Sequence, residues 1–299
     1  MESVEGKVVV ITGGVSGIGL GIAKVFASAG MKIVLGYRRR DHLDEALAWF
    51  GARPELVVCP VPLDVTDRDA WRAALDTAEA EFGQIDVLVN NAGISFIGGI
   101  DQATYDDWEW IMKVNFWGVV NGITECLPRI RRHGRGGHII NVSSMAAYLS
   151  GAEIGLYATS KFAVRGLTEA LRPAVAHLGI GVSELAPGLT RSNIHHAAEK
   201  RPAEFANTNF TPDAELIGKF GELMNMGMEP EEVGRRTLAG MKENRPIIFS
   251  HPESRDEVRE ICDAIVAAFP TDTPPPERAA IEEHRRAGKA KAGSILDAE

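Results

Sequence analysis

The chain has 299 residues, of which 45% are hydrophobic and 24% are charged, and its formal net charge is -9. This composition is typical of a globular protein with a sizeable core, and an acidic chain without a basic block is a poor candidate for nucleic-acid binding. No apolar run approaches the ~20 residues of a membrane-spanning helix, and the acidic stretch Met1–Lys7 is unlike a secretory signal, so we expect a cytoplasmic protein without membrane or nucleic-acid partners.

Short apolar runs alternate with segments of helical periodicity along the chain. The runs that predict strands are Lys7–Thr12, Met31–Gly36, Leu56–Leu63, Ile85–Asn90, Gly137–Val142, Ile180–Leu185 and Pro246–Phe249. The segments that predict helices are Ile18–Ala29, Arg68–Phe82, Tyr105–Arg132 and Leu156–His177. Such alternation is typical of βαβ units, so we predict an α/β fold: a single Rossmann-like, doubly wound parallel sheet of about seven strands with helices on both faces.

Two regions interrupt this alternation. Residues 188–230 contain no clear strand, and we predict that they form a helical lid over the site. Residues 269–299 begin with the proline-rich run Thr271–Pro276 and end in a charged stretch, which predicts a C-terminal tail with a helix around Glu277–Arg286. The expected division is therefore one main domain over residues 1–268, followed by this tail.

A glycine-rich turn follows the first predicted strand. The run Thr12–Gly19 lies between an apolar strand and an amphipathic helix. A turn without side chains lets the backbone approach a pyrophosphate, and the start of the next helix offers free N–H groups. Glycines can also simply close a loop, but this position favours a dinucleotide site. The candidate cofactor-binding residues here are Gly13, Ser16, Gly17, Ile18 and Gly19.

Three side chains form the strongest chemical signal. Tyr157 and Lys161 are four residues apart at the start of a predicted helix, so both project from one face. Ser144 follows a predicted strand, and parallel sheets bring strand ends and helix starts to one crevice. An adjacent ammonium lowers the pKa of a phenol from ~10, and a hydroxyl can donate to a substrate oxygen where charge develops. An ordinary surface pair is the alternative for an isolated Tyr-x-x-x-Lys.

The chain resembles the short-chain dehydrogenases/reductases. The motifs that carry the resemblance keep the family's order over roughly residues 5–195: Thr12–Gly19, Leu63–Val65, Asp86 with Asn90–Gly93, Asn115, Ser143-Ser144, Tyr157–Lys161 and Pro187-Gly188. The resemblance implies an NAD(P)-dependent oxidoreductase whose main domain binds the cofactor and carries out catalysis. Tyr157 would be the general acid/base, Lys161 would hold the nicotinamide ribose, and Ser144 would orient the carbonyl. Asn115 would keep a water that links Lys161 to solvent.

The resemblance also implies the outline of a cofactor site. Asp64 and Val65 would bracket the adenine, and the run Asn91, Ala92 and Gly93 would line the adenosine ribose. Relatives usually have Pro-Gly followed, after three further residues, by a Thr that contacts the nicotinamide carboxamide. Here Pro187 and Gly188 lead to Ser192 at that position, with Thr190 as the alternative.

A narrower resemblance concerns the lid. The segment Ser192–Pro230 and the long tail are similar to bacterial Cα-dehydrogenases of lignin-derived aryl ethers, which oxidise benzylic secondary alcohols. The lid and the rim of the site are rich in Met and Phe, which suit an aromatic ligand but can equally hold the lid on the core. The residues expected to contact substrate are Ser144, Met145, Phe96, Leu149, Ile194 and Met226.

We therefore expect the substrate to be a hydrophobic, possibly aryl-substituted, ketone or secondary alcohol. A steroid, polyketide or acyl-type carbonyl is the alternative substrate class. A lyase or epimerase with a transiently used cofactor, and a non-catalytic nucleotide-binding protein, are the alternative functions.

The end of the second predicted strand bears on the choice of cofactor. A carboxylate there would accept the ribose hydroxyls of NAD, but the run is Tyr37-Arg38-Arg39-Arg40. Because Arg donates bidentately to phosphate, we expect NADP(H) to be preferred, with Tyr37, Arg38 and Arg39 in the site. An exposed basic turn, with NAD(H) as the cofactor, is the alternative. Ser16 favours that alternative, because many NADP-dependent relatives have a basic residue there.

Other partners are expected to be few. The three cysteines are odd in number and far apart, and the histidines show no ligand spacing, so we expect no disulfide framework and no metal. The helices predicted at Tyr105–Arg132 and Leu156–His177 have more apolar positions than one buried face needs, and they resemble helices that pair in relatives. We expect a homodimer or homotetramer.

Overall fold

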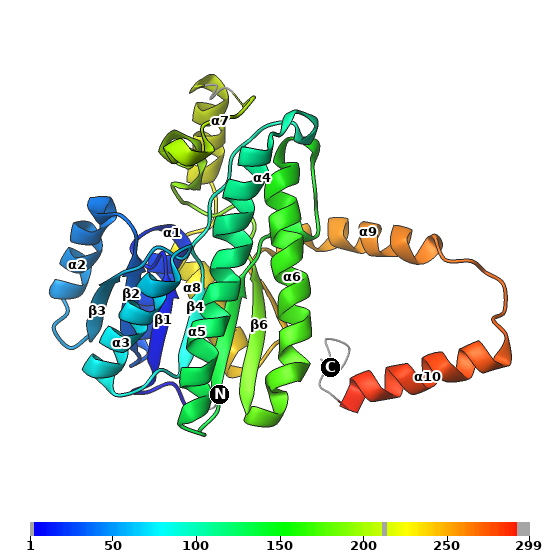
Figure 1. The fold of residues 1–299 in the computed structure, drawn as a ribbon, viewed down its shortest axis with the longest axis horizontal. Helices are drawn as coiled ribbons and strands as arrows, with labels where there is room; N and C mark the ends of the chain where they lie inside the picture. The colour runs from blue at the N-terminus through cyan, green and yellow to red at the C-terminus, as the bar shows by residue number, and fades with distance from the viewer. Residues whose placement is uncertain (1–2, 211–213, 292–299) are drawn as a thin grey trace.

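A parallel sheet forms the centre of the protein. The computed structural model describes residues 3–210 and 214–291, and its strands pair in the order β3-β2-β1-β4-β5-β6-β7, all parallel (Figure 1). Their bounds are β1 Val8–Thr12, β2 Lys32–Tyr37, β3 Val58–Pro62, β4 Val87–Asn90, β5 Gly137–Val142, β6 Ile180–Ala186 and β7 Ile247–Phe249. The strand order reverses between β1 and β4, so the predicted doubly wound sheet of seven strands is confirmed.

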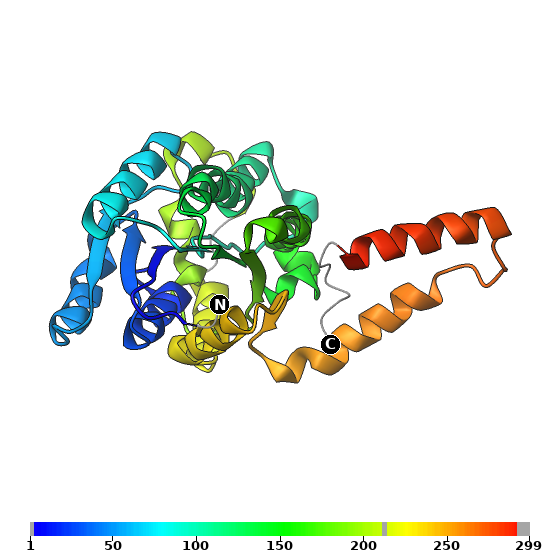
Figure 2. The same cartoon turned by 90° about the horizontal axis from the view of Figure 1, so that it is seen from below.

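Helices cover both faces of this sheet (Figure 2). Their bounds are α1 Gly17–Ser28, α2 Leu43–Gly51, α3 Arg68–Phe82, α4 Tyr105–Met112, α5 Gly118–Arg132, α6 Gly155–Val175, α7 Ala214–Asn225, α8 Pro230–Lys242, α9 Arg255–Ala267 and α10 Pro276–Lys291. Side chains of β1 alternate between two cores, as the two-residue period of a strand requires. Val8 and Val10 pack on the side of α3, α5 and α6, whereas Val9 and Ile11 pack on the side of α1 and α8.

The segment predicted as one helix over Tyr105–Arg132 is helical throughout, with an irregularity in its middle. Thr104 and Asp107 form a capping box at the start of α4, which fixes where the helix begins. A π-helical turn, Lys113–Trp117, then separates α4 from α5. Turns of this kind are rare and often lie at functional sites. This one carries Asn115, one of the predicted catalytic residues.

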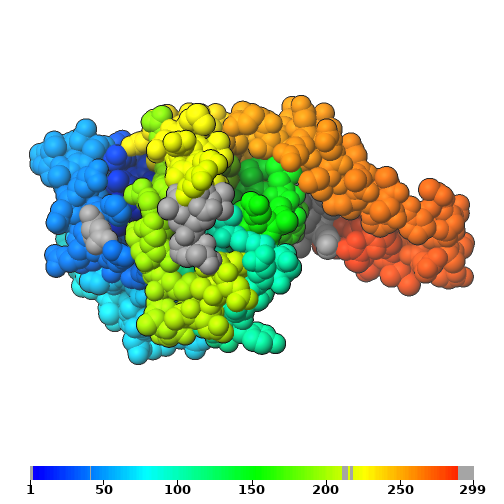
Figure 3. All heavy atoms as spheres, turned by 90° about the horizontal axis from the view of Figure 1, so that it is seen from above, coloured from blue at the N-terminus to red at the C-terminus, as the bar shows by residue number. Residues whose placement is uncertain are grey.

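The predicted lid is irregular. Short 3-10 turns lie between Ile194 and Phe205, and α7 follows them. Thr190 pairs with Met228 in an isolated bridge, so the two ends of the segment meet. Figure 3 shows these residues on the face seen from above.

The C-terminal part projects from the body. Helices α9 and α10 extend away from the sheet on the side where α6 lies (Figures 1 and 2). The predicted tail helix around Glu277–Arg286 falls within α10, whereas α9 was not predicted and lies before residue 269. The division at residue 268 stays a prediction. Among residues 3–210 and 214–291, no helix is both long and apolar enough to cross a membrane.

Candidate active site

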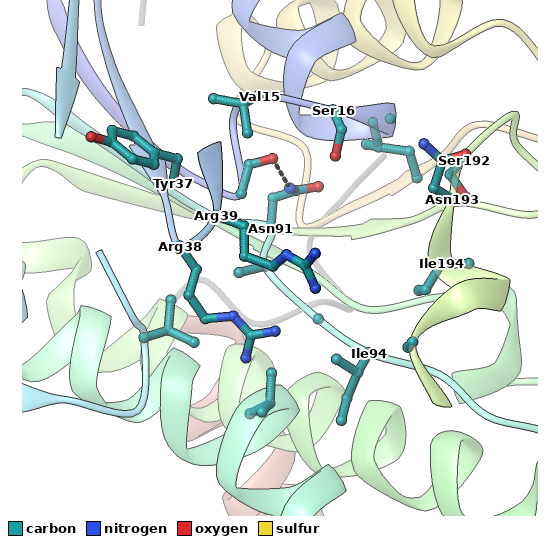
Figure 4. Close-up of a pocket in the computed structure, with 18 of the residues that line it drawn as sticks. Val15, Ser16, Tyr37, Arg38, Arg39, Asn91, Ile94, Ser192, Asn193 and Ile194 are labelled. Carbon is teal, nitrogen blue, oxygen red and sulfur yellow. Dashed lines mark hydrogen bonds between the residues drawn. The ribbon is translucent and has the colours of Figure 1, made fainter. Parts of the chain in front are cut away.

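A pocket lies at the carboxyl ends of the central strands, where a doubly wound sheet places its ligands. Its volume is about 280 Å³. It extends from the glycine-rich turn and the end of β2 to the first turns of α6. Five of the described lid residues also line it, among them Ser192, Asn193 and Ile194 (Figure 4). Most predicted cofactor residues line it: Gly13, Ser16, Gly17, Ile18, Tyr37, Arg38, Arg39, Asp64, Val65, Asn91, Ala92, Gly93, Tyr157, Lys161 and Ser192.

The glycine-rich turn has the shape that a dinucleotide requires. Gly13 and Gly17 have φ angles of 62° and 49°, in the left-handed region that favours glycine. A Cβ atom on Gly19 would lie 2.3 Å from the carbonyl oxygen of Gly13, so only glycine fits there. Gly17 begins α1, whose first N–H groups have no partner within the helix. The turn therefore forms a cradle that fits a pyrophosphate.

The loop after β4 is tied to this turn. The Thr12 hydroxyl accepts hydrogen bonds from the backbone N–H groups of Asn91 and Ala92, each at 2.9 Å. The Asn91 side chain donates to the carbonyl oxygens of Thr12 and Gly13, at 2.9 and 3.2 Å. Asn91 thus fixes the loop and lines the pocket at the same time. Asp64 is also engaged, because it accepts hydrogen bonds from the backbone and hydroxyl of Thr66.

Three of the four predicted catalytic side chains, Ser144, Tyr157 and Lys161, lie near one another. Tyr157 and Lys161 line one end of the pocket, whereas Ser144, which is also a predicted substrate residue, is not among the lining residues. The Ser144 hydroxyl lies near the Tyr157 phenol, and its interaction with that phenol favours a lower pKa of Tyr157. The Lys161 ammonium lies 5.6 Å from the centroid of the Tyr157 ring and donates to the Val142 carbonyl oxygen at 3.0 Å. Strand β5 thus anchors the lysine, and α6 presents both Tyr157 and Lys161 to the pocket.

The pKa values of these groups correct one expectation. Burial raises the pKa of Tyr157, and the interaction with Ser144 only partly opposes this shift. Burial lowers the pKa of Lys161 from 10.5 to about 8. The expected lowering of the Tyr157 pKa by Lys161 is therefore wrong for this structure, because loss of hydration dominates at both groups.

Asn115 links helix α6, which carries Tyr157 and Lys161, to the loop after β4. Its side-chain oxygen accepts from the Ile94 backbone N–H at 2.8 Å. Its amide donates to the Ile94 carbonyl oxygen at 2.9 Å and to the Ser160 hydroxyl at 3.0 Å. A Cβ atom on Gly93 would lie 3.3 Å from the Asn115 side-chain oxygen, which is tighter than most such contacts. The water-holding role of Asn115 stays a prediction.

Ser192 and Thr190 are the two candidates for the threonine that contacts the nicotinamide carboxamide in relatives, and the turn after β6 places them differently. Ser192 lines the pocket, and a Cβ atom on Gly17 would approach its side chain to 3.1 Å. Thr190 is buried, and its hydroxyl donates to the Gly188 carbonyl oxygen at 3.1 Å. Pro187, Gly188 and Thr190 therefore shape the turn but do not line the pocket.

Sequence reasoning missed two residues that support this site. His251, buried after β7, accepts a hydrogen bond from the Gly188 N–H at 2.9 Å, and its other ring nitrogen lies 2.8 Å from the Leu189 carbonyl oxygen. Glu184, buried on β6, accepts hydrogen bonds from the hydroxyls of Ser143 and Tyr148. These hydroxyls flank Ser144 on both sides along the chain. Burial raises the pKa of Glu184, and the two hydrogen bonds oppose that shift.

The predicted substrate residues are only partly brought together. Ile194 lines the pocket beside Asn193. Phe96 does not, because its ring stacks on Trp110 with centroids 5.4 Å apart, in the core beneath the lid. Met226 is 75% exposed, and neither Met145 nor Leu149 is among the lining residues. Phe96 therefore fits the alternative interpretation, in which it holds the lid on the core and does not contact the substrate.

A buried ion pair anchors the lid to α4. The Arg201 guanidinium lies 2.7 Å from the Asp107 carboxylate, which is fully buried, and 4.6 Å from the centroid of the Trp110 ring. The Thr208 hydroxyl donates to the same carboxylate at 2.8 Å. Burial would raise the pKa of Asp107, but hydrogen bonds from Thr104 and Thr208 and the Arg201 charge hold it below its usual value.

Comparison with known proteins identifies the family. The sequence pattern of the short chain dehydrogenase family matches residues 7–203. The C alpha-dehydrogenase of Sphingobium sp. strain SYK-6 is 36% identical over 267 residues, which are 89% of this chain and 87% of that protein. This chain belongs to the short-chain dehydrogenase family. The predicted assignment as a short-chain dehydrogenase/reductase, an enzyme of the oxidoreductase class, is confirmed.

Several solved structures share the fold over nearly the whole chain. One from Novosphingobium aromaticivorans is 36% identical, covers 98% of both chains and has a TM-score of 0.83. The apo form of LigO from Sphingobium sp. strain SYK-6 is 37% identical, covers 97% of this chain and 98% of its own, and has a TM-score of 0.77. One from Burkholderia phymatum, in complex with NAD, is 31% identical, covers 92% of this chain and 100% of its own, and has a TM-score of 0.83.

Proposed function

We propose that this short-chain dehydrogenase moves a hydride between a nicotinamide dinucleotide and a bulky, aryl-substituted ketone or secondary alcohol. One observation carries the proposal. A single pocket has the glycine-rich turn and two arginines at one end and the Tyr157–Lys161 pair at the other. This pairing of a dinucleotide cradle with an acid/base pair is what hydride transfer at a carbonyl carbon needs.

The pocket residues divide the work of holding the cofactor. The N–H groups at the start of α1 would bind the pyrophosphate, Asp64 and Val65 would bracket the adenine, and Asn91–Gly93 would line the adenosine ribose. Lys161 would donate to the nicotinamide ribose. The nicotinamide, when bound, supplies or accepts the hydride.

Tyr157 handles the proton. In reduction its phenol donates a proton to the substrate oxygen, and in oxidation the phenolate removes one. The raised pKa keeps the phenol protonated at neutral pH, which suits the acid role. Ser144 donates a hydrogen bond to the substrate oxygen as negative charge develops.

For the cofactor we propose NADP(H) over NAD(H). The guanidinium groups of Arg38 and Arg39 extend into the pocket (Figure 4), and His42 and Lys200 also line it. Among the described residues that line the pocket, Asp64 is the one with an acidic side chain. Its carboxylate already accepts a hydrogen bond from the Thr66 backbone N–H. NAD(H) is the alternative, because the Burkholderia phymatum relative is a complex with NAD.

The cofactor proposal is tested by kcat/KM with NADPH and NADH in the wild type, Arg38→Ala and Arg40→Ala. Arg40 does not line the pocket and serves as the matched control. We expect the wild type to prefer NADPH, and Arg38→Ala to lose about 10-fold with NADPH, the equivalent of one charge-assisted hydrogen bond. A wild-type preference for NADH would contradict the proposal.

The substrate class has support from relatives. The Sphingobium relative is a C alpha-dehydrogenase, and Ile194 and Ala197 give the lid side of the pocket an apolar lining. The test is steady-state kinetics followed by nicotinamide absorbance. An aryl alkyl ketone or its alcohol should exceed acetone-sized and polyol substrates in kcat/KM by about 10-fold or more. Better efficiency on a sugar or an acyl thioester would overturn the substrate class and leave hydride transfer intact.

A further inference from the structure

The buried side chain of His251 bonds to two peptide groups of the turn that follows β6. The Gly188 N–H donates to Nδ1 at 2.9 Å, and Nε2 lies 2.8 Å from the Leu189 carbonyl oxygen. A Cβ atom on Gly188 would lie 2.7 Å from Cγ of the imidazole ring, so only glycine lets the ring lie this close to the backbone. His251 is not among the described residues that line the pocket, so its influence on the site passes through this turn.

These two partners determine where the ring carries its proton. A backbone N–H can only donate and a carbonyl oxygen can only accept, so Nδ1 is unprotonated and Nε2 carries the hydrogen. The Ser250 hydroxyl, 2.8 Å from Nδ1, can donate to the same atom. The two bonds to the turn therefore require the neutral ring in one tautomer, and each ring nitrogen holds a different peptide group.

The first of these peptide groups connects His251 with the loop that carries Ser144. Its N–H belongs to Gly188, and its carbonyl oxygen, on Pro187, accepts a hydrogen bond from the Met145 N–H at 2.8 Å. Met145 follows Ser144 directly in the chain. This peptide group is thus held from both sides, by His251 and by the Ser144 loop. Among the described residues, His251 is the acceptor for the Gly188 N–H.

The second peptide group has a further donor. The Leu189 carbonyl oxygen also accepts from the Met228 N–H at 2.9 Å, at the end of the lid. The turn then continues to Ser192, which lines the pocket and lies close to Gly17 of the glycine-rich turn. Loss of the Nε2 bond would therefore leave the Leu189 carbonyl with a partner, whereas loss of the Nδ1 bond would take from the Gly188 N–H its acceptor.

We propose that His251 is a positioning residue for hydride transfer. Through the Gly188 N–H it fixes the turn between Ser144, which would meet the substrate oxygen, and Ser192, which would meet the dinucleotide, and so it sets the spacing of the two reactants. The inference rests on the proposed function, because both reactants must bind in this pocket. Reactants that are slightly misplaced react much more slowly. The dinucleotide should still bind, since the hydrogen bonds that hold the glycine-rich turn come from the loop after β4.

Two amide variants separate the two bonds. The side-chain oxygen in His251→Asn lies as many bonds from Cα as Nδ1 does, so it can accept from Gly188. The amide nitrogen in His251→Gln lies as many bonds from Cα as Nε2 does, so it can donate to Leu189. Because Leu189 has Met228 as a second donor and Gly188 depends on His251, the Gln variant should be the more damaged of the two.

The rate of hydride transfer in a single turnover, with an aryl alkyl ketone and followed by nicotinamide absorbance, measures this difference. We expect it to fall by about 10-fold or more in His251→Gln, through misplacement of the reactants. In His251→Asn it should fall by no more than about 3-fold, the scale of one weak hydrogen bond. The dissociation constant of the dinucleotide, from fluorescence titration, should change by less than about 3-fold in both variants.

The pair of variants also excludes a role in stability alone. Each variant loses the ring and one of its two bonds to the turn, so a purely stabilising residue would give similar rates in both. His177→Gln, at an exposed histidine after α6, is the control and should keep the wild-type rate. Equal rates in His251→Gln and His251→Asn, or a lower rate in His251→Asn, would overturn the proposal.

Hydrogen exchange of the cofactor-free protein tests the bond without any turnover. The Gly188 amide should exchange faster in His251→Gln than in the wild type and in His251→Asn, because it loses its acceptor. Unchanged exchange of Gly188 in His251→Gln would contradict the proposal even if the rates differed. A wild type that transfers no hydride would instead overturn the proposed function, and the exchange data would still show whether His251 holds the turn.

Discussion

The cofactor side and the lid side of this pocket are built differently. On the cofactor side, Thr12, Asn91, Asn115 and Lys161 each bond to backbone atoms at the ends of strands or in the loops that follow them. On the lid side, residues 192–210 include short turns that are held by side chains far away in the sequence, and the buried pair Asp107–Arg201 is one of these contacts. Tyr157 and Lys161 therefore lie on a regular helix that packs against the sheet, whereas Ser192, Asn193 and Ile194 lie in irregular turns. We therefore expect substitutions in the lid to change substrate specificity and substitutions near the sheet to change catalysis.

The largest expected effect is the loss of the Tyr157 hydroxyl. In Tyr157→Phe we expect turnover to fall by about 100-fold or more, the usual scale for loss of a general acid/base. Cofactor affinity, measured by fluorescence titration, should change little, because the backbone cradle is untouched. Tyr105→Phe is the control, since Tyr105 is 87% exposed. Near-normal activity of Tyr157→Phe would refute the acid/base assignment.

A pH-dependent effect is expected from Lys161. Its pKa is about 8 in the folded protein and 10.5 when solvated, so the unfolded chain holds more protons between these values. The free energy of unfolding of the cofactor-free wild type should therefore rise with pH across this window, and the penalty for the buried charge is full below it. Lys161→Met should lack this rise.

Urea unfolding of both proteins at several pH values from about 8 to 10.5 measures the difference. The wild-type minus variant difference removes the contribution of every other titrating group. Lys219→Met, at an exposed lysine on α7, is the matched control and should titrate like the wild type. A difference that stays flat across the window would mean that Lys161 is not desolvated.

Loss of the Asp107–Arg201 ion pair should weaken substrate binding without changing cofactor binding. Arg201→Met leaves the buried Asp107 carboxylate without its ion-pair partner, which is costly. We expect the substrate KM to rise by about 10-fold, equivalent to about 1.4 kcal/mol of binding, with cofactor affinity unchanged. Lys113→Met, which removes an exposed lid ion pair with Glu204, should have almost no effect. Equal losses of cofactor and substrate binding in Arg201→Met would show that the two sides are not independent.

A smaller effect is expected at Glu184. Glu184→Gln keeps the shape but replaces one acceptor by a donor, so either Ser143 or Tyr148 loses its partner. We expect kcat to fall about 5-fold through misplacement of Ser144, the factor that ~1 kcal/mol of a hydrogen bond supplies. Glu169→Gln, at an exposed carboxylate on α6, is the control. A Glu184→Gln enzyme with changed KM and unchanged kcat would assign Glu184 to binding instead.

The strands, the helices that cover them and the side chains at the strand ends are the features that the sequence predicts best. Strand β5 and helix α3 have the predicted bounds, because their apolar patterns record burial directly. The Tyr157, Lys161 and Ser144 constellation follows from the same logic, since strand ends and helix starts meet at one crevice.

The rest depends on contacts between distant parts of the chain. His251 meets Gly188 across 63 residues, and Glu184 meets Ser143 across 41, so no local pattern marks either. Phe96 was predicted at the substrate because apolar residues near a site look alike in sequence, whether they line a pocket or support it. Helix α9 was missed because it packs so little against the body.

The transfer of an isotopic label tests hydride transfer most directly. An aryl secondary alcohol that carries deuterium on its carbinol carbon would be incubated with the enzyme and oxidised cofactor, and the products analysed by mass spectrometry. We expect deuterium in the reduced nicotinamide, with equal amounts of reduced cofactor and ketone. Product formed without net reduction of the cofactor would contradict it, as would deuterium released to water. Either result would point to a lyase or an epimerase that uses its cofactor only transiently.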